Sequence, residues 1–258
     1  MNNATHNPQI LQQYEDITTL EGYKKLCSEL WHHNKLYFID DAPEISDETY
    51  DALLKLLEDL EQKHPDWVSP ASPSQRIGEV LIDGFATVTH SAPMLSFHKI
   101  FSREEIEEFV IRMKENVGRE GLLFSTEIKM DGASVAVRYE NGVLVQALTR
   151  GSGKEGSDIT ANVKTIASLP LQLHGDNVPE VLEVRGEIVM PRSVFDAFNE
   201  QRRAHGEDVW ANPRNAAAGA LKLLDPKKVA ERRLAIYFYV VAEDSSNGFD
   251  AQYDSFEF

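Results

Sequence analysis

The stretch SVAVRYENGVLVQAL, residues 134–148, decides the fold class of this chain. Val135, Val137 and Tyr139 recur at every second position, which is the period of a half-buried strand. The Asn-Gly pair that follows is favoured in the two-residue turn of a β-hairpin. The stretch therefore predicts two antiparallel strands joined by a tight turn.

Similar patterns extend outward from this hairpin. Apolar runs predict further strands at 122–128, 182–190 and 234–241. Apolar residues at helical spacing predict helices at 102–117 and 193–204. An antiparallel-rich sheet core with flanking helices belongs to the α+β class.

The first part of the chain has a different, purely helical pattern. A first amphipathic helix carries Tyr23, Leu26 and Leu30 on one face, and a second begins at Ser46 or Asp47 and ends before Pro65. The polar, proline-broken segment 69–74 follows this helical hairpin. Because compact contacts can continue beyond it, we expect a helical domain at 1–83 and a second domain at 84–258.

Composition predicts a soluble, monomeric, cytoplasmic protein. The chain has 258 residues and 42% hydrophobic side chains, enough to build a sizeable core. We find no apolar run long enough to span a bilayer and no signal peptide at the N-terminus, so we expect no membrane contact. Cys27 is the single cysteine, which excludes an intrachain disulfide. His32 and His33 are adjacent and should point to different sides of a helix, so we expect no shared metal site.

Charge is unevenly distributed. The net charge is −16, which should repel a polyanion such as DNA. Residues 1–83 carry 6 basic and 16 acidic side chains, whereas residues 185–233 carry 10 basic and 7 acidic ones. Any DNA contact is therefore expected on the second region, where a solvated face of mixed charge is the alternative interpretation.

The stretch Glu127-Ile128-Lys129-Met130-Asp131-Gly132 contains the candidate nucleophile, Lys129. In an extended strand Glu127 and Lys129 point the same way, so both can contact one ligand. A lysine with a pKa of about 10.4 is neutral only to roughly 0.1% near neutral pH, so a nucleophilic lysine needs a site that lowers its pKa. The alternative is an exposed strand followed by an ordinary Asp-Gly turn.

The chain resembles the NAD-dependent DNA ligases in order from about residue 20 to 242, and several short motifs carry this resemblance. They are 127–132, 139–145, 149–151, 158–163, 182–187 and 211–219. The resemblance implies a nucleotidyltransferase core, similar to the ATP-grasp-like ligases, that uses NAD and Mg²⁺. It implies that Lys129 attacks the adenylate phosphorus of NAD, forms lysyl-AMP and releases nicotinamide mononucleotide (NMN). In the full-length enzyme the AMP then activates the 5′ phosphate of a nick in duplex DNA.

The resemblance also implies roles around the nucleotide. Glu127 accepts a hydrogen bond from the adenine amino group, Ser96 and Phe97 approach the adenine ring, and Arg150 contacts the nucleotide. Glu187 contacts ribose or metal. Further candidates are Asp131, Arg214 and Lys222, the last standing where an arginine is expected. A core aromatic for Phe97 and an exposed ion pair between Arg185 and Glu187 remain alternatives.

The helical hairpin carries the residues that the resemblance assigns to the NMN half of NAD, namely Tyr37, Asp47, Glu48, Thr49, Tyr50 and Asp51. For Asp47 a plain helix N-cap is the alternative, and for Tyr50 a core position. Phe38 stands where these ligases carry His, and a phenyl ring cannot hydrogen-bond a phosphate.

Other functions remain open at this point. A match to G-x-G-x-x-G at 151–156 follows a hairpin instead of opening a βαβ unit, so a dinucleotide-binding Rossmann fold is not expected. The resemblance further implies that the last nucleotidyl-transfer strand and the DNA-encircling parts of these ligases lie beyond this chain, so we expect weak DNA binding, or none, by this chain alone. An ATP-dependent polynucleotide ligase and a non-catalytic NAD-binding or interaction module are the alternatives.

Overall fold

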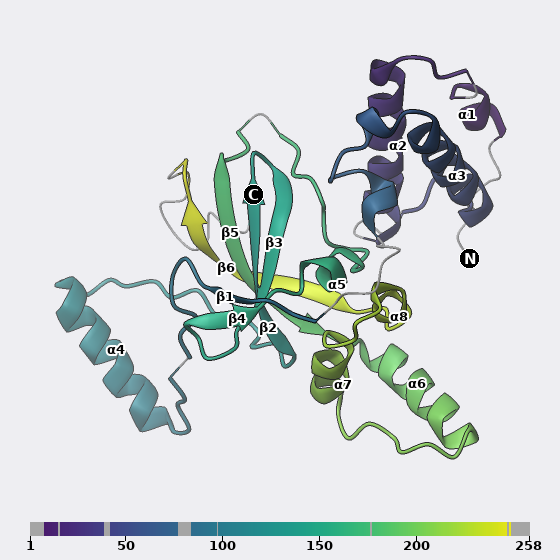
Figure 1. The fold of residues 1–258 in the computed structure, drawn as a ribbon. Helices are drawn as coiled ribbons and strands as arrows, with labels where there is room; N and C mark the ends of the chain where they lie inside the picture. Colours follow the sequence, from purple (N-terminus) through teal and green to yellow (C-terminus); the bar gives the residue numbers. More distant parts are fainter. Residues whose placement is uncertain are drawn as a thin grey trace.

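The computed structural model describes residues 8–14, 16–38, 42–76, 84–96, 98–175, 177–246 and 248. Its centre is a four-stranded sheet of order β3-β2-β5-β6, in which all neighbours are antiparallel (Figure 1). The strands are β2 (Ala133–Glu140), β3 (Val143–Thr149), β5 (Val181–Val189) and β6 (Ala235–Asp244). The predicted mixture of helices and antiparallel strands is thus confirmed.

The hairpin between β2 and β3 forms for the reason that the sequence indicates. Asn141 and Gly142 both have positive φ, 49° and 78°, as a type I′ turn requires. Glu140 pairs with Val143 directly across the turn, and β5 pairs along the other edge of β2. Strand β2 is therefore central in the sheet, and Val135, Val137 and Tyr139 are buried as predicted.

Five helices and a second, two-stranded sheet belong to the same part of the described chain. They are α4 (Arg103–Val117), α5 (Thr160–Lys164), α6 (Arg192–Ala204), α7 (Pro213–Ala220), α8 (Pro226–Ala230) and the two-stranded sheet of β1 (Thr87–Thr89) with β4 (Glu155–Ser157). Helix α5 contacts β3, and α7 contacts β2 and β5. Leu169, Ile188 and Ala217 lie in the core between them. We call residues 84–248 the sheet unit.

The N-terminal elements form a separate small core. They are α1 (Pro8–Gln12), α2 (Leu20–Phe38), α3 (Asp47–Lys63) and the 3₁₀ turns η1 (Pro65–Trp67) and η2 (Pro73–Arg76). Tyr23, Leu26, Leu30 and Leu53 are buried between α2 and α3, as the helical periodicity predicts. We call residues 8–76 the helical unit.

The strand predicted at 122–128 is wrong. Residues 121–131 belong to no helix or strand, and Leu123 and Ile128 are 99% and 86% exposed. An apolar run becomes a strand only where a neighbouring strand satisfies its backbone groups, and within the described residues none pairs with this segment. The argument that a strand aligns Glu127 with Lys129 therefore does not hold.

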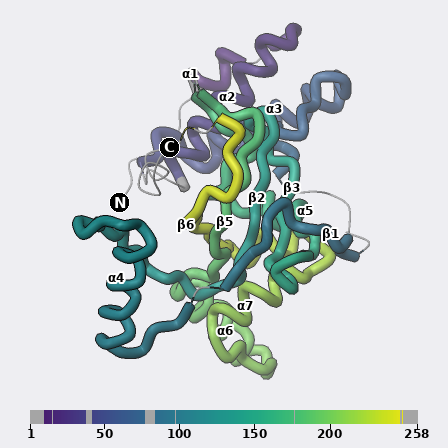
Figure 2. Tube along the Cα trace, turned by 90° about the vertical axis from the view of Figure 1, so that its left-hand side faces the viewer, coloured from purple at the N-terminus to yellow at the C-terminus, as the bar shows by residue number. Residues whose placement is uncertain are grey.

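Helix α4 has the residue range predicted from the sequence, but its apolar face is not buried. Ser102 caps it by accepting a hydrogen bond from the Glu105 amide at 3.2 Å. No side chain of α4 is buried, and Ile106 and Ile111 are more than half exposed. Figures 1 and 2 show why, because α4 stands apart from the sheet in both views.

A search of the described residues for helices long and apolar enough to cross a membrane finds none.

Candidate active site

Glu187 is the centre of the site on the sheet. It lies on β5 and is 5% exposed. Its carboxylate accepts a hydrogen bond from the Gly132 amide at 3.2 Å and another from the Ser134 hydroxyl at 2.8 Å. Arg185, which was the alternative partner for Glu187, instead donates to Glu183 and to the carbonyls of Ala92 and Pro93. The exposed Arg185–Glu187 pair is therefore absent.

Gly132 allows the Lys129 segment to approach β5. A Cβ atom at this position would lie 2.2 Å from the Ile188 carbonyl oxygen, far inside a van der Waals contact. Only glycine fits, and the close approach brings the Gly132 amide onto Glu187. The glycine of the Lys-x-Asp-Gly motif thus positions the chain that leads back to Lys129.

Asp131 and Arg214 connect this segment to α7. The Arg214 guanidinium donates to the Asp131 carboxylate at 2.7 Å. That hydrogen bond, with further attraction from Asp131 and Glu187, raises the pKa of Arg214. The Asn212 side chain caps α7 by accepting a hydrogen bond from the Asn215 amide. This cap fixes the first turn of α7, on which Arg214 lies. Glu127 and Lys129 are both exposed nearby in sequence.

Arg150 and Ser96 are brought together, as expected for two groups of one site. The Arg150 guanidinium donates to the Ser96 hydroxyl at 2.7 Å and to the Met94 carbonyl at 3.4 Å. The segment before Ser96 is held to the sheet through Ser91, which donates to Glu183 at 2.6 Å. Phe97 lies outside the described residues.

The glycine loop at 151–156 has a structural role. Gly151 and Gly153 have positive φ, 52° and 89°, and a Cβ at Gly153 would lie 2.9 Å from the Met94 carbonyl oxygen. The loop leads directly into β4, and the Met94 amide donates to the Gly153 carbonyl. It therefore supports the segment that carries Ser96 and opens no βαβ unit.

Tyr239 is a site residue that the sequence reasoning missed. It lies on β6, and its pKa is raised by burial and by the nearby charge of Glu187, while Ser134, Arg185 and Arg150 act in the opposite direction. These influences place its phenol among the polar groups of the site. Its position on an alternating strand was the available signal, but the sequence alone does not tell which face of β6 meets Glu187.

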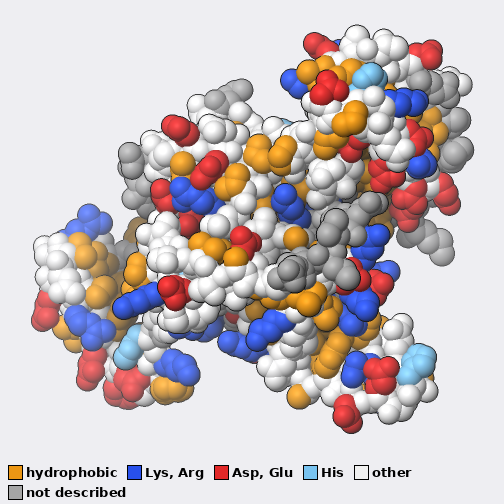
Figure 3. Space-filling view, in the orientation of Figure 1, with side chains coloured by type: hydrophobic (Ala, Val, Ile, Leu, Met, Phe, Trp, Pro, Cys, Tyr) orange, Lys and Arg blue, Asp and Glu red, His pale blue; other side chains and the backbone are white. Residues whose placement is uncertain are grey.

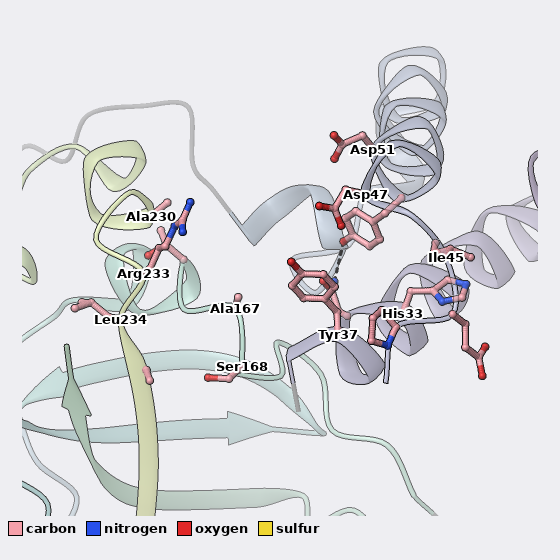
Figure 4. Close-up of a pocket in the computed structure, with 16 residues that line it drawn as sticks. His33, Tyr37, Ile45, Asp47, Asp51, Ala167, Ser168, Ala230, Arg233 and Leu234 are labelled. Carbon is pink, nitrogen blue, oxygen red and sulfur yellow. Dashed lines mark hydrogen bonds between the residues drawn. The ribbon is translucent and has the colours of Figure 1, made fainter. Parts of the chain in front are cut away.

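A cavity of about 720 Å³ lies between the helical unit and the sheet unit. Figure 4 shows Tyr37, Asp47 and Asp51 on one side, facing Ala167, Ser168 and Arg233 on the other. The volume is within the range of about 300–1,000 Å³ that small-ligand sites occupy. Arg233, with a positive φ of 45°, was not predicted.

Four of the six residues expected to hold the NMN half line this cavity, namely Tyr37, Asp47, Tyr50 and Asp51. Ser46 is the N-cap of α3, so the alternative role of Asp47 as the cap is wrong. Tyr50 accepts a hydrogen bond from Asn34 at 2.8 Å, which fixes its ring at the cavity wall.

Glu48 and Thr49 are not among the lining residues. Thr49 is fully buried, with its hydroxyl 3.2 Å from that of Ser46, and Glu48 is exposed on the first turn of α3. Helical geometry turns their side chains away from the face that carries Asp47 and Asp51. The side chain of Phe38 lies outside the described part of the chain.

Arg76 joins the two units. Its guanidinium donates to the carbonyls of Lys164, Ile166 and Leu169 at 3.4, 2.6 and 3.1 Å. It also lies 4.9 Å from the ring centre of Trp31 on α2. Burial lowers the pKa of Arg76 to about 10, so it stays charged at neutral pH. The carbonyls belong to the segment that supplies Ala167 and Ser168 to the cavity, so Arg76 positions that wall.

The two groups of predicted residues occupy different places. None of the cavity-lining residues comes from the Lys129 segment, and β6 links the regions because Ala235 lines the cavity while Tyr237 pairs with Glu187. Lys222 is exposed after α7, and its backbone amide donates to the Gly219 carbonyl at 3.2 Å. The structure thus gathers Asp131, Glu187 and Arg214 at one place and Arg150 with Ser96 beside Tyr239.

This architecture, an antiparallel sheet with flanking helices and a lysine segment beside a buried glutamate, is that of a nucleotidyltransferase-type adenylation domain. Residues 82–258 match the family model of the NAD-dependent DNA ligase adenylation domain. Residues 17–78 match the DNA ligase-like, N-terminal NAD⁺-binding domain. The chain therefore belongs to the NAD-dependent DNA ligase family.

Individual relatives agree with this family. A DNA ligase of Protochlamydia amoebophila is 56% identical over 230 residues, which cover 89% of this chain and 35% of the relative. Those of Fervidobacterium nodosum and Bacteroides fragilis are 46% and 45% identical, over 91% and 89% of this chain and 34% of each relative. The chain thus spans about a third of the length of these relatives.

Proposed function

We propose that this chain performs the self-adenylation step of an NAD-dependent DNA ligase, with Lys129 as the nucleophile. The observation that carries the proposal is the attachment of the Lys129-to-Gly132 segment to Glu187 and Arg214. Gly132 donates to Glu187 and Asp131 accepts from Arg214, so the segment that carries Lys129 is joined to a carboxylate and to a cation of the sheet unit. Family membership supports the use of NAD, and the cavity between the units offers a place for its second half.

The reaction is a substitution at phosphorus. The lone pair of the Lys129 amine attacks the adenylate phosphorus of NAD, a P–N bond forms, and the P–O bond to NMN breaks. The amine loses a proton to solvent, and NMN leaves with its phosphate. The product is AMP bound to Lys129.

The neighbouring groups bind and orient the nucleotide. Arg150 and Arg214 are cations suited to phosphate and ribose oxygens, and Ser96, held by Arg150, is set to contact the base. We assign Glu127 to the adenine amino group and Tyr239 to the base, because Tyr239 lies among Glu187, Ser134 and Arg150. Phe97 and Lys222 remain candidates on the resemblance alone.

The residues present fit a magnesium ion. Asp131 and Glu187 supply carboxylate oxygens, the ligand type that Mg²⁺ prefers, and Arg214 lies close enough to both to be influenced by each. When bound, Mg²⁺ would neutralise charge on the phosphates. These protein groups would orient the nucleotide for attack by the Lys129 amine, since positioning is a large part of such catalysis.

The cavity supports a preference for NAD over ATP. The nicotinamide ring of NAD carries a positive charge, and Asp47 and Asp51 supply negative charge on the cavity wall beside the rings of Tyr37 and Tyr50. Arg233 on the opposite wall is suited to the NMN phosphate. We include Glu48 and Thr49 in this proposal only as residues that shape the first turn of α3.

The proposal extends to the whole molecule. We place the domain boundary after residue 83, so that 1–83 binds NMN and 84–258 binds and carries AMP, with a core similar to the ATP-grasp-like ligases. In the full-length enzyme, AMP passes from Lys129 to the 5′ phosphate of nicked duplex DNA, and the 3′ hydroxyl then displaces it.

Intact-mass spectrometry tests the proposal. After incubation with NAD and Mg²⁺, the wild-type chain should gain the mass of one AMP, and ATP should give much less. Lys129→Ala should give none. Lys164→Ala is the matched control, because burial lowers the pKa of Lys164, which favours the neutral form of its amine.

The outcomes separate the alternatives. An adduct that persists in Lys129→Ala, or disappears in Lys164→Ala, would refute the assignment of the nucleophile. An adduct formed equally well from ATP would favour an ATP-dependent ligase. NAD binding by calorimetry with no adduct would favour a non-catalytic NAD-binding module.

A further inference from the structure

Three metal-binding side chains gather where α2 meets the segment before α3. His32, His33 and Glu44 each offer one ligand atom, and the three atoms lie within 4.8 Å of one another. The two imidazole ring centres are 5.4 Å apart, and His32 Nε2 is 3.7 Å from a Glu44 carboxylate oxygen. The expectation that adjacent histidines point to different sides of the helix therefore does not hold here, because one nitrogen of each ring lies within 4.8 Å of a Glu44 carboxylate oxygen.

His33 is in an environment typical of a ligand histidine. It is 5% exposed, and its Nε2 lies 3.2 Å from a carboxylate oxygen of Glu29. Its Nδ1 is buried and has no hydrogen-bond partner among the described residues. If Nε2 donates its proton to Glu29, Nδ1 carries the lone pair. Histidines that bind metals commonly have a carboxylate at the second ring nitrogen, which fixes the tautomer.

An unpaired polar atom in a buried position needs an explanation, since burying it without a partner costs about 1–3 kcal/mol. A metal ion would provide a partner. We propose that His32, His33 and Glu44 form a binding site for a zinc-type divalent cation, with Glu29 orienting His33. Two imidazoles and one carboxylate suit Zn²⁺, and hard cations such as Mg²⁺ prefer oxygen ligands.

The ligands need only a small movement to close on an ion. Tetrahedral zinc with bonds of about 2.0–2.1 Å holds its ligand atoms roughly 3.4 Å apart. His32 and Glu44 are 53% and 64% exposed and can rotate, whereas His33 is held in place. Water completes the coordination. His33 is thus already in position to bind an ion, and the side chains of His32 and Glu44 would rotate toward it.

The position of the site has a consequence for the cavity. Glu44 belongs to the short segment between α2 and α3, and both His33 and Glu44 line the cavity wall. A bound ion would join this segment to α2 and fix the start of α3, where Asp47 lies. The inference depends only on these contacts and does not require the proposed adenylation.

Titration of the metal-free chain, residues 1–258, with Zn²⁺, followed by calorimetry, tests the site. We expect one ion per chain. His32→Ala and Glu44→Gln should each weaken binding by at least about tenfold. The exposed His174→Ala is the matched control and should bind zinc as the wild type does. Because His32 and Glu44 are exposed, both variants should fold, which circular dichroism checks.

Cobalt gives an independent measurement. Co²⁺ in the site should show the intense visible absorption of four-coordinate cobalt, and this absorption should be absent from a His32→Ala/Glu44→Gln double variant. Zinc binding of unchanged affinity in the double variant would overturn the proposal. So would the weak spectrum of hydrated cobalt in the wild type, or a failure of calorimetry to detect binding.

Discussion

Gly132 makes the sharpest prediction at the scale of single residues. A Cβ there would meet the Ile188 carbonyl oxygen at 2.2 Å, and this oxygen belongs to a central strand that cannot move easily. We expect Gly132→Ala to lower the free energy of unfolding by about 3 kcal/mol or more, because overpacking against backbone is among the most damaging changes. Thermal and urea unfolding measure this.

Gly121 provides the control for that substitution. It lies in the same irregular segment, and a Cβ there would meet nothing within 4 Å. Gly121→Ala should therefore leave the free energy of unfolding within about 0.5 kcal/mol of wild type. Equal stabilities of the two variants would show that the close approach at Gly132 is relieved by backbone movement.

Single residues also show how far the sequence leads. The short motifs indicated Asp131, Glu187 and Arg214 through their resemblance to one family, and the structure brings these three residues to one place. Tyr239 was missed, since a strand pattern gives the alternation of side chains but not which side faces the site. Arg233 was missed because it lies in irregular backbone before β6, where no local pattern marks a cavity residue. His33 was misjudged because the direction of a helical side chain was argued without its rotamer.

At the scale of elements, the hairpins were predictable and the Lys129 segment was not. The Asn141-Gly142 turn and the helical stripes are local signals, and they gave β2, β3, α2 and α3. The short β1 and β4, three residues each, pair across 66 or more positions and carry no local signal. The apolar run at 122–128 has the composition of a strand, but pairing is a non-local condition.

Hydrogen exchange should separate these two kinds of element. Amides of β2 are bonded on both sides and should be protected, whereas those of residues 122–128 lie in no helix or strand and should exchange rapidly. Exchange followed by peptide mass spectrometry measures both. Protection of 122–128 comparable to that of β2 would show that the segment pairs with another strand in solution.

At the scale of the whole molecule, Arg76 controls how the two units meet. The planar guanidinium of Arg76 donates to three carbonyls. A lysine at this position would keep the charge but lacks that planar group and could not donate to all three. We expect Arg76→Lys to increase the radius of gyration in small-angle scattering and to raise the Kd for NAD more than it lowers the rate constant of self-adenylation. Arg119→Ala, an exposed arginine, serves as control. Unchanged scattering and Kd in Arg76→Lys would show that other contacts hold the units together.

Net charge leads to a prediction about DNA. Acidic side chains are frequent over the helical unit in Figure 3, while Lys and Arg gather below the sheet around α7 and α8. With a net charge of −16, we expect this chain to bind nicked duplex DNA with a Kd weaker than about 10⁻⁴ M at physiological salt. Fluorescence anisotropy measures this. Micromolar binding with a steep salt dependence would contradict it, and charge reversal at Lys227 and Lys228 would then locate the contact.

The walls of the cavity come from both units, and this makes ligand binding and interdomain docking reciprocal. A ligand that touches both walls binds the docked arrangement best. By thermodynamic linkage it must favour docking by the same factor by which docking favours the ligand, so an affinity gain of about tenfold is also a shift of about tenfold in the docking equilibrium. A bound nucleotide thereby increases the fraction of molecules in which the two units are docked. Release of one half of the ligand decreases that fraction.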